Sequence, residues 1–307
     1  GKPSLLSDAS LKLWLDASHS NSVIKDGSNN VSKWMDLSGN GFNTLQSSST
    51  SMPTFIDNAV NNSPGVRFDG NNDYIWTETS TSITDATIIV LTQLGTIDFS
   101  DSNSGGAVVS IQEAGNDNFD AIVYHEHSEA DRKFMHGSSS HSRLHISSHT
   151  EVDTGPFVIQ DQFKTGDFRQ FRNGVLVSSE SYTAINKPNT RFIIGNRHFL
   201  YSGLSPVTNG YWNGDVLEVL IFDKVISDSE RVEINAYLSN KWGLESKIDS
   251  DGDGVVDASD LAPKDPTIQA DLTVDMNGKP TVLSDASLKL WLDASHSNSV
   301  VKDGSNN

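Results

Sequence analysis

The sequence predicts an all-β protein, an antiparallel β-sandwich with one short packing helix near its C-terminal end and an Asp-rich calcium-binding linker after the helix. Many short runs of alternating or β-branched residues are separated by Gly, Asn and Asp turn signals. These runs do not alternate with helical patterns, as they would around a parallel sheet. The chain also has 13 Phe, 6 Trp and 6 Tyr, enough to fill a core, which argues against disorder.

The expected strands share a short length and an apolar or β-branched character. They are residues 11–16, 31–36, 65–69, 74–76, 87–94, 107–111, 119–124, 157–163, 168–172, 175–179, 191–195 and 216–222. Residues 87–94 are apolar almost throughout, so we expect a central strand covered on both faces. Asn173 and Gly174 between two strands predict a two-residue type I′ hairpin.

One helix is expected after residue 227. Ser227 and Glu230 have the spacing of a capping box, and Gly243 is placed to end the helix. Apolar residues between Ile234 and Trp242 recur on one face. We therefore expect a helix that packs over one end of the sandwich.

The beginning of the chain occurs twice. Residues 278–307 repeat residues 1–30 with three differences, Ser4/Thr281, Leu5/Val282 and Ile24/Val301. A repeat this long is a whole domain, so the chain is one unit of a tandem array and the start of the next. The expected division is a sandwich at 1–247, a calcium linker at 248–268, and a linker with the first strand of the next repeat at 269–307.

The second copy has two interpretations. Its strand, residues 288–293, is either donated to a neighbouring subunit, which would build a head-to-tail fibre, or it simply begins the next unit. In both cases the expected partners are neighbouring copies of the same repeat.

The composition excludes several kinds of partner. With 22 Lys and Arg against 40 Asp and Glu, the net charge of −18 should repel nucleic acid and anionic lipid and attract cations. No apolar run is long enough for membrane insertion. Cysteine is absent, so no disulfide stabilises the fold and a metal is an attractive cross-link.

The clearest chemical signal is the acidic segment 249–260. If Asp249 is position one, its residues follow the ligand spacing of a twelve-residue EF-hand loop, with Gly254 at the sharp turn. The expected calcium ligands are the carboxylates of Asp249, Asp251, Asp253, Asp257 and Asp260 and the main-chain carbonyl of Val255. The alternative is a solvated acidic linker, but acids so regularly spaced would repel one another without a counter-ion.

Two other groups are candidates for a ligand or a metal. His125 and His127 flank Glu126 and would face one way on a strand, although a Ser/His-rich exposed loop is the alternative. Asp36, Ser38, Asn40 and Asn43 are candidates for holding calcium or a sugar hydroxyl, or else form an Asx-rich turn that satisfies its own backbone.

The aromatic side chains of the late segment, Tyr201, Tyr211 and Trp212, are suited either to stack on a sugar or to fill the core.

Several motifs together resemble a concanavalin A-like (laminin G-like) jelly-roll domain. They are Leu13-Trp-Leu-Asp16, Trp34-Met-Asp-Leu-Ser-Gly-Asn-Gly41, Val66-Arg-Phe-Asp-Gly70, Arg172-Asn-Gly174, Gly214-Asp-Val-Leu-Glu-Val-Leu-Ile-Phe222 and the helix that ends at Trp242-Gly243. The resemblance covers roughly residues 5–245. It implies the fold and leaves open lectin, adhesive and spacer functions.

The linker resembles a thrombospondin type 3 repeat, through its acidic loop and the following Leu261-Ala-Pro-Lys-Asp-Pro266. The cysteine that this family usually has before the proline is Ala262 here, which leaves calcium (Ca²⁺) as the main organiser. The resemblance also implies Asp265 as a candidate ligand of a second calcium ion.

We therefore expect an extracellular or cell-surface tandem-repeat protein, either an adhesin whose lectin-like sandwiches bind glycans or a filament subunit and spacer with no ligand of its own. We expect no enzyme. Glycosidases of this fold carry a Glu-x-Asp-x-x-Glu run on one strand, which places two carboxylates across the scissile bond. Glu218 lies instead between the apolar Val216 and Leu220.

Overall fold

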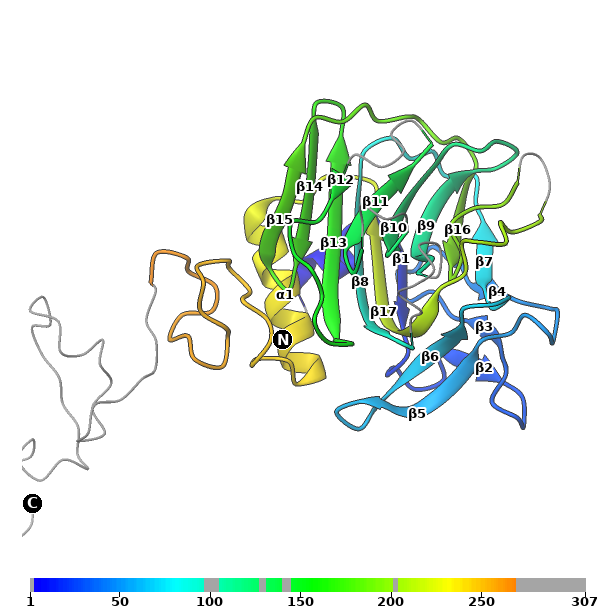
Figure 1. Cartoon of the computed structure of the whole chain (residues 1–307), viewed down its shortest axis with the longest axis horizontal. Helices are drawn as coiled ribbons and strands as arrows, with labels where there is room; N and C mark the ends of the chain where they lie inside the picture. The colour runs from blue at the N-terminus through cyan, green and yellow to red at the C-terminus, as the bar shows by residue number, and fades with distance from the viewer. Residues whose placement is uncertain (1–2, 97–104, 127–130, 140–144, 201–203, 269–307) are drawn as a thin grey trace, which may run out of the picture.

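The computed structural model describes residues 3–96, 105–126, 131–139, 145–200 and 204–268. Two antiparallel sheets face each other, and helix α1 (Asp228–Trp242) lies against the first of them (Figure 1). This confirms the predicted β-sandwich with one C-terminal helix. Within the described residues, no helix has the length and apolar character needed to cross a membrane.

The first sheet, sheet A, has the order β15-β14-β13-β8-β17-β6-β5, and β1 also pairs with β17. Its strands are β1 (Leu11–Asp16), β5 (Thr54–Val60), β6 (Ser63–Asp69), β8 (Ala86–Leu94), β13 (Phe157–Lys164), β14 (Asp167–Arg172), β15 (Val175–Glu180) and β17 (Asn213–Phe222). Strand β8 lies between β13 and β17 and is buried on both faces, as its apolar sequence predicts.

The second sheet, sheet B, has the order β12-β11-β10-β9-β16-β7-β4-β3-β2. Its strands are β2 (Val23–Lys25), β3 (Val31–Trp34), β4 (Thr44–Leu45), β7 (Ile75–Glu78), β9 (Ala107–Glu113), β10 (Phe119–Tyr124), β11 (Phe134–Ser138), β12 (His145–Ile146) and β16 (Thr190–Ile194). A short 3-10 helix, η1 (Ser4–Ser7), precedes β1.

Local signals set the turns and the helix ends as predicted. Asn173 and Gly174 both have positive φ, 49° and 91°. The Ser227 Oγ accepts the Glu230 amide at 3.2 Å, and the Glu230 carboxylate accepts the Ser227 amide at 2.7 Å. Gly243 ends the helix with a φ of 64°.

The sequence suggested that the helix covers one end of the sandwich, and this prediction is wrong. Its apolar face packs on the outer face of sheet A, where Ile234, Leu238 and Trp242 meet Leu217 and Leu220 of β17. The second face of sheet A faces the main core between the sheets. Sheet A is therefore covered on both sides, which explains the nearly continuous burial of β17.

The expectation of a long exposed loop around the histidines is wrong for part of that stretch. Residues 134–138 and 145–146 are strands β11 and β12, and both His136 and His145 are buried. The polar composition of this stretch suggested a loop. The strands were missed because the side chains that hydrogen-bond to His136 come from other parts of the chain.

A buried polar network joins the two sheets at this point. His136 on sheet B bonds through Nδ1 to Asp161 of sheet A at 2.9 Å and through Nε2 to Asp120 at 3.1 Å. Lys187 and the Tyr182 hydroxyl also contact Asp120. Every charge in this network is therefore met by an opposite charge or a hydrogen bond inside the protein.

The network affects protonation. Burial alone would lower the pKa of His136, but hydrogen bonds with Asp120 and Asp161 outweigh it and raise the pKa to about 9. Burial would raise the pKa of Asp120, yet His136 and Lys187 hold it lower, at about 2.

We predict that the free energy of unfolding falls as pH rises from about 6.5 to about 9, because the folded protein keeps the His136 proton that the unfolded chain releases. The slope approaches about 1.4 kcal/mol per pH unit in this window. Urea unfolding at several pH values measures it. The variant His136→Gln should lose the slope, whereas the exposed His19→Gln should keep it; equal slopes in both variants would contradict the assignment.

Candidate functional site

The acidic segment after the helix is docked on the sandwich. The Asp249 amide donates to the Asn173 carbonyl in the β14–β15 turn at 3.0 Å. The helix residue Asn235 donates to the Ser250 carbonyl at 3.2 Å. The Arg231 guanidinium bonds to the Gly174 carbonyl at 3.0 Å and also reaches the Ser250 carbonyl at 3.5 Å. The hairpin, the helix and the segment thus form one packed unit.

The turn at Gly174 has room for no side chain. A Cβ there would lie 1.6 Å from the carbonyl oxygen of Asp249. The glycine therefore serves two purposes, since it supplies the positive φ of the turn and allows the acidic segment to approach the hairpin backbone.

Within the segment, carboxylates fold the backbone around themselves. Asp249 accepts the Gly252 amide at 2.7 Å and the Gly254 amide at 2.9 Å. Asp253 accepts the Val255 amide at 2.8 Å. Gly252 and Gly254 have φ of 83° and 101°, conformations that glycine adopts without strain. The result is a tight loop with its acids turned inward.

Three of the predicted ligands meet in this loop. Asp249, Asp251 and Asp253 each offer a carboxylate oxygen, and these oxygens all lie within 4.8 Å of one another. Asp251 and Asp260 are 5% and 6% exposed, and Oδ2 of each is buried without a hydrogen-bond partner. Buried carboxylate oxygens normally accept hydrogen bonds, so the donor set fits a hard cation such as Ca²⁺, which prefers oxygen ligands.

The crowding raises pKa values in the loop. Burial, together with the charges of Asp253, Asp260 and Asp249, raises the pKa of Asp251 to about 6. Burial also raises the pKa of Asp257, against the hydrogen bonds from Ser250. The loop is therefore electrostatically costly in its ionised form, and a cation would remove that cost.

The remaining predicted ligands have different surroundings. Asp257 accepts the Ser250 amide and hydroxyl, both at 2.8 Å, and so closes the loop. Val255 lies in the same loop with its amide bound to Asp253. Asp265 lies outside the loop, where its carboxylate accepts the Thr267 amide and hydroxyl.

The residues 36–43 form a turn that hydrogen-bonds to itself. The Asp36 carboxylate accepts the amides of Trp14, Ser38 and Phe42 at 2.9–3.1 Å. Asn43 accepts the Asp36 amide, and Asn40 donates to the Leu11 carbonyl. The contacts with Trp14 and Leu11 tie the turn to β1. The contacts within the turn satisfy its own backbone, as in the Asx-turn interpretation of the sequence.

The other candidate residues are dispersed. His125 is buried, and its Nδ1 accepts the Arg132 amide at 3.1 Å. His127 and Tyr201 lie outside the described residues, as does the repeated segment 278–307 with its strand 288–293. Trp212 is buried in the main core, whereas Tyr211 is half-buried at the surface.

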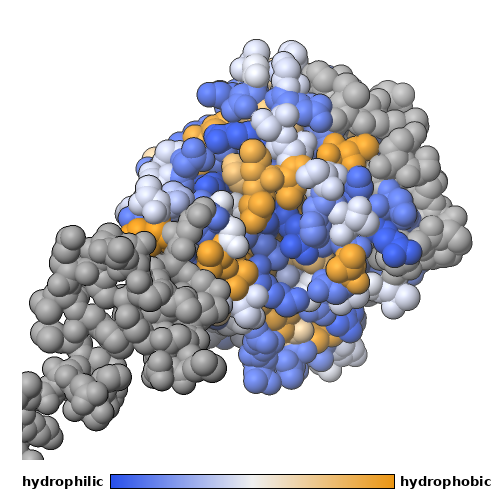
Figure 2. All heavy atoms as spheres, turned by 60° about the vertical axis from the view of Figure 1, so that its left-hand side comes forward, coloured by the Kyte–Doolittle hydropathy of each residue, from blue (hydrophilic) through white to orange (hydrophobic). Residues whose placement is uncertain are grey.

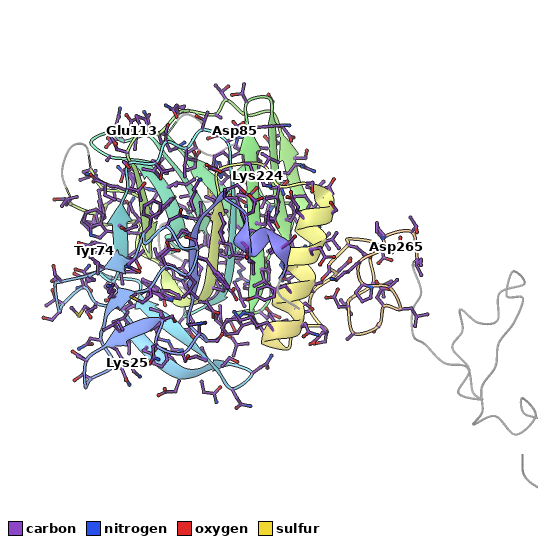
Figure 3. The ribbon with its side chains drawn as sticks, turned by 180° about the vertical axis from the view of Figure 1, so that it is seen from behind. Lys25, Tyr74, Asp85, Glu113, Lys224 and Asp265 are labelled. Carbon is purple, nitrogen blue, oxygen red and sulfur yellow. The ribbon has the colours of Figure 1, made fainter. Side chains whose placement is uncertain are left out.

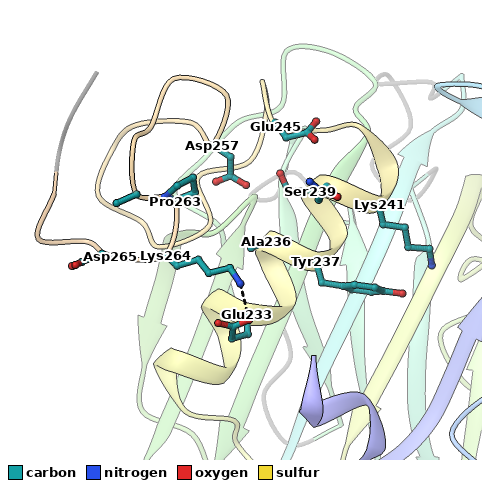
Figure 4. A pocket seen from close by; sticks show the side chains of 12 residues that line it. Glu233, Ala236, Tyr237, Ser239, Lys241, Glu245, Asp257, Pro263, Lys264 and Asp265 are labelled. Atoms are coloured by element: carbon teal, nitrogen blue, oxygen red, sulfur yellow. Dashed lines mark hydrogen bonds and ion pairs between the residues drawn. The ribbon is translucent and has the colours of Figure 1, made fainter. Parts of the chain in front are cut away.

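A groove of about 770 Å³ separates helix α1 from the end of the acidic segment. Tyr237 and Lys241 line its helix side, and Pro263 and Asp265 line the other (Figure 4). The Lys264 ammonium crosses to Glu233 at 2.8 Å. From the direction of Figure 2, hydrophobic side chains form small separate groups on a mostly hydrophilic surface.

A second groove, of about 690 Å³, lies where β6, β8 and β17 meet the segment 151–154. Its charged walls are already paired. Arg67 holds Asp215 through two hydrogen bonds of 2.7 and 2.9 Å, and Glu151 is bound by Arg172 at 2.6 Å. Paired groups of this kind offer hydrogen bonds to a polar ligand without a strong net charge.

The buried carboxylate of Glu218, whose neighbours in the sequence pattern are apolar, connects three elements of the fold. Glu218 of β17 accepts the indole N–H groups of Trp14 and Trp242 at 2.8 and 2.7 Å. It also accepts Lys241 at 2.6 Å, and Lys241 reaches Asp16 at the same distance. Burial and Asp16 raise the pKa of Glu218, against the opposing charge of Lys241. Strand β1, strand β17 and helix α1 thus meet at one side chain.

Sequence reasoning missed the residues that support the loop from outside. Arg231 and Asn235 lie on the helix face next to the loop, but their motif resembles an ordinary amphipathic helix. Glu218 was considered only for catalysis. Its partners are far away in the sequence, so spacing alone gave no signal.

No model of a known protein family matches the sequence, and the comparison with curated proteins found no match either. Solved structures do share its fold. One is Trypanosoma rangeli sialidase in complex with sialic acid, with 12% identity over 77% of this chain and a TM-score of 0.51. Another is Domain 4 of AbnA, a GH43 extracellular arabinanase from Geobacillus stearothermophilus, in complex with arabinotriose, with 11% identity over 72% of this chain and a TM-score of 0.50.

The two similarities differ in extent. The chain spans 34% of the sialidase but 95% of the arabinanase domain. At this identity both show the β-sandwich fold alone.

The expectation that the chain is not an enzyme is contradicted by these comparisons. Part of a sialidase and a domain of an arabinanase share its fold. A missing Glu-x-Asp-x-x-Glu run therefore does not separate this chain from glycoside hydrolases. The likeness does not demonstrate an activity, but the exclusion no longer stands.

We predict that Glu218→Gln lowers the free energy of unfolding by about 3 kcal/mol, because the amide nitrogen replaces one acceptor of a buried charged network. Denaturant unfolding followed by tryptophan fluorescence measures the change. Glu233→Gln, on helix α1, removes only an exposed ion pair with Lys264 and should cost about 1 kcal/mol or less. Equal effects of the two substitutions would refute the role of Glu218.

Proposed function

We propose that the chain is a calcium-stabilised unit of a tandem-repeat adhesin or surface filament, with a β-sandwich that binds glycans. The observation that carries the calcium part is the loop 249–260, where buried Asp251 and Asp260 oxygens lack hydrogen-bond partners. A cation would meet these oxygens and offset the repulsion among the neighbouring acids.

The proposed ligands are those that the loop spacing gives. Asp249, Asp251 and Asp253 supply carboxylate oxygens that lie close together, and Asp260 and the Val255 carbonyl are the further ligands. Calcium takes about six to eight oxygens. The resemblance of this segment to a thrombospondin type 3 repeat, and of the sandwich to laminin G-like domains, agrees with this assignment. Asp265 remains a candidate for a second ion.

The proposed consequence of binding is mechanical. The loop is attached to helix α1 and to the β14–β15 turn through Arg231, Asn235 and Gly174. An ion that fixes the loop fixes the direction in which the chain leaves the sandwich toward the next unit. Extracellular calcium modules bind at about 10⁻⁴–10⁻³ M, which suits a protein that is secreted or at the cell surface.

Glycan binding is supported by the arabinanase domain. This chain spans nearly all of that domain, which was solved with arabinotriose. The same sandwich repeated along a chain would gain avidity for surface glycans. The competing function is a pure spacer, in which successive units assemble head to tail and bind no ligand.

We predict that calcium raises the melting temperature of the apo protein. If the dissociation constant is about 10⁻⁴ M, 10 mM calcium adds about 2.7 kcal/mol, or roughly 5–10 °C. Differential scanning calorimetry and calcium titration calorimetry measure both values. Asp251→Asn should abolish the shift. The exposed Asp57→Asn, which removes the same charge elsewhere, should leave it unchanged; a full shift in Asp251→Asn would count against the site.

We also predict retention of the protein on at least one soluble polysaccharide in affinity electrophoresis, with mobility recovered by competing oligosaccharide. Bovine serum albumin serves as the reference for non-specific retardation. Unchanged mobility across neutral and anionic polysaccharides would favour the spacer.

A further inference from the structure

We infer that the partly exposed rings of Tyr74, Trp76 and Tyr211 form the surface on which a neutral glycan stacks. This inference rests on the proposed glycan binding and adds a site and a ligand class. We name these three residues the aromatic platform. Figure 3 shows Tyr74 on the opposite side of the sandwich from α1 and Asp265, so the platform is remote from the acidic loop.

The platform has a buried aromatic base. Phe199 is fully buried, and its ring lies 5.6 Å from Tyr74 and 5.2 Å from Trp76, nearly perpendicular to both. Tyr211 lies 6.5 Å from Tyr74 at an angle of 39°. The edge-to-face contacts with Phe199 hold the rings of Tyr74 and Trp76 in place, and Tyr211 packs against Tyr74 at a tilt. Rings that are fixed before binding lose little conformational entropy on contact with a ligand.

The backbone under the platform is equally constrained. Trp76 is in β7, which pairs with β16 on one side and with β4 on the other. The Tyr74 amide donates to the Ser51 carbonyl at 3.2 Å, and the Tyr74 carbonyl accepts the side-chain amide Nε2 of Gln46 at 2.9 Å. Leu45 of the neighbouring strand β4 is paired with Trp76 in the sheet and is 52% exposed. The apolar surface therefore continues beyond the rings.

Polar groups surround this apolar surface. Burial, and then the charges of Tyr74 and Asp69, raise the pKa of Tyr211. The exposed Asn71 and Asn72 extend from the turn after Asp69. Arg191 lies 5.9 Å from the Trp76 ring and bonds to Glu78 at 2.7 Å. A sugar ring has an apolar C–H face and hydroxyls at its edge. Flat rings bordered by amides and carboxylates match both parts.

The charge of the border is nearly balanced, because Arg191 is paired with Glu78 and Lys33, which lies beside Leu45 on the neighbouring strand, is opposite in sign to Asp69. The whole chain, however, is acidic, with a net charge of −18. Anionic sugars would be repelled, so the platform fits neutral glycans.

The test compares the full chain with variants by affinity electrophoresis in gels that contain neutral arabinan, neutral xyloglucan or anionic polygalacturonate. We expect retardation by at least one neutral polymer and none by polygalacturonate. Trp76→Ala and Tyr211→Ala should each weaken binding by about tenfold or more. Trp76→Phe keeps a ring and should keep most of the affinity. Leu176→Ala, which truncates an exposed apolar residue of β15 in the other sheet, should change it little. Thermal melts of each variant check the fold.

Each outcome decides the matter. If the unaltered chain binds none of the neutral polymers, the glycan part of the proposed function fails and this inference fails with it. If the chain binds but both alanine variants bind equally well, only the platform is overturned. Loss of binding in Arg67→Ala would then place the site in the groove beside Asp215. Binding of polygalacturonate as strong as that of the neutral polymers would overturn the ligand class.

Discussion

The carboxylate of Glu218 fixes the position of helix α1 on sheet A, and the helix in turn supports the acidic loop. Glu218 accepts hydrogen bonds from Trp14 in β1 and from Trp242 and Lys241 in the helix. On the same buried face, nearer its N-terminus, the helix carries Arg231 and Asn235, which bind carbonyls of the hairpin and of the loop. A change at this one buried group would therefore affect the first strand, the helix and, through the helix, the loop.

Two groups of buried charge differ in a way that bears on function. In the inter-sheet network, His136 and Lys187 meet the carboxylates of Asp120 and Asp161, so no outside partner is needed. In the acidic loop, carboxylates face one another, and oxygens of Asp251 and Asp260 have no hydrogen-bond partner. Burial of like charges is costly unless they are paired. The loop, unlike the network, has the properties of a cation site.

Much of the fold was predictable because its signals are local. The type I′ turn at Asn173 and Gly174, the capping box at Ser227 and the central strand at 87–94 depend on neighbouring residues, and the structure has each of them. The loop spacing is local too. The short strands β4 and β12 were missed because two residues give no periodicity. The burial of His136 was missed because its partner Asp161 lies on the other sheet.

The position of the helix and the surface sites could not be deduced from sequence for the same reason. The contact of Gly174 with Asp249, the packing of Tyr74 and Trp76 on Phe199, and the contact of Tyr211 with Tyr74 join residues far apart in the chain. The missing Glu-x-Asp-x-x-Glu run led to the expectation of no enzyme, and the similarity to part of a sialidase and to an arabinanase domain removed that exclusion. Such features follow from topology, which residue spacing does not encode.

The most direct test of the calcium assignment is a crystal structure of the chain grown with millimolar calcium and measured at a wavelength that gives an anomalous calcium signal. The account predicts a single strong peak inside the loop, at about 2.3–2.6 Å from carboxylate oxygens of Asp249, Asp251 and Asp253. Ordered density for the loop with no anomalous peak there would contradict it.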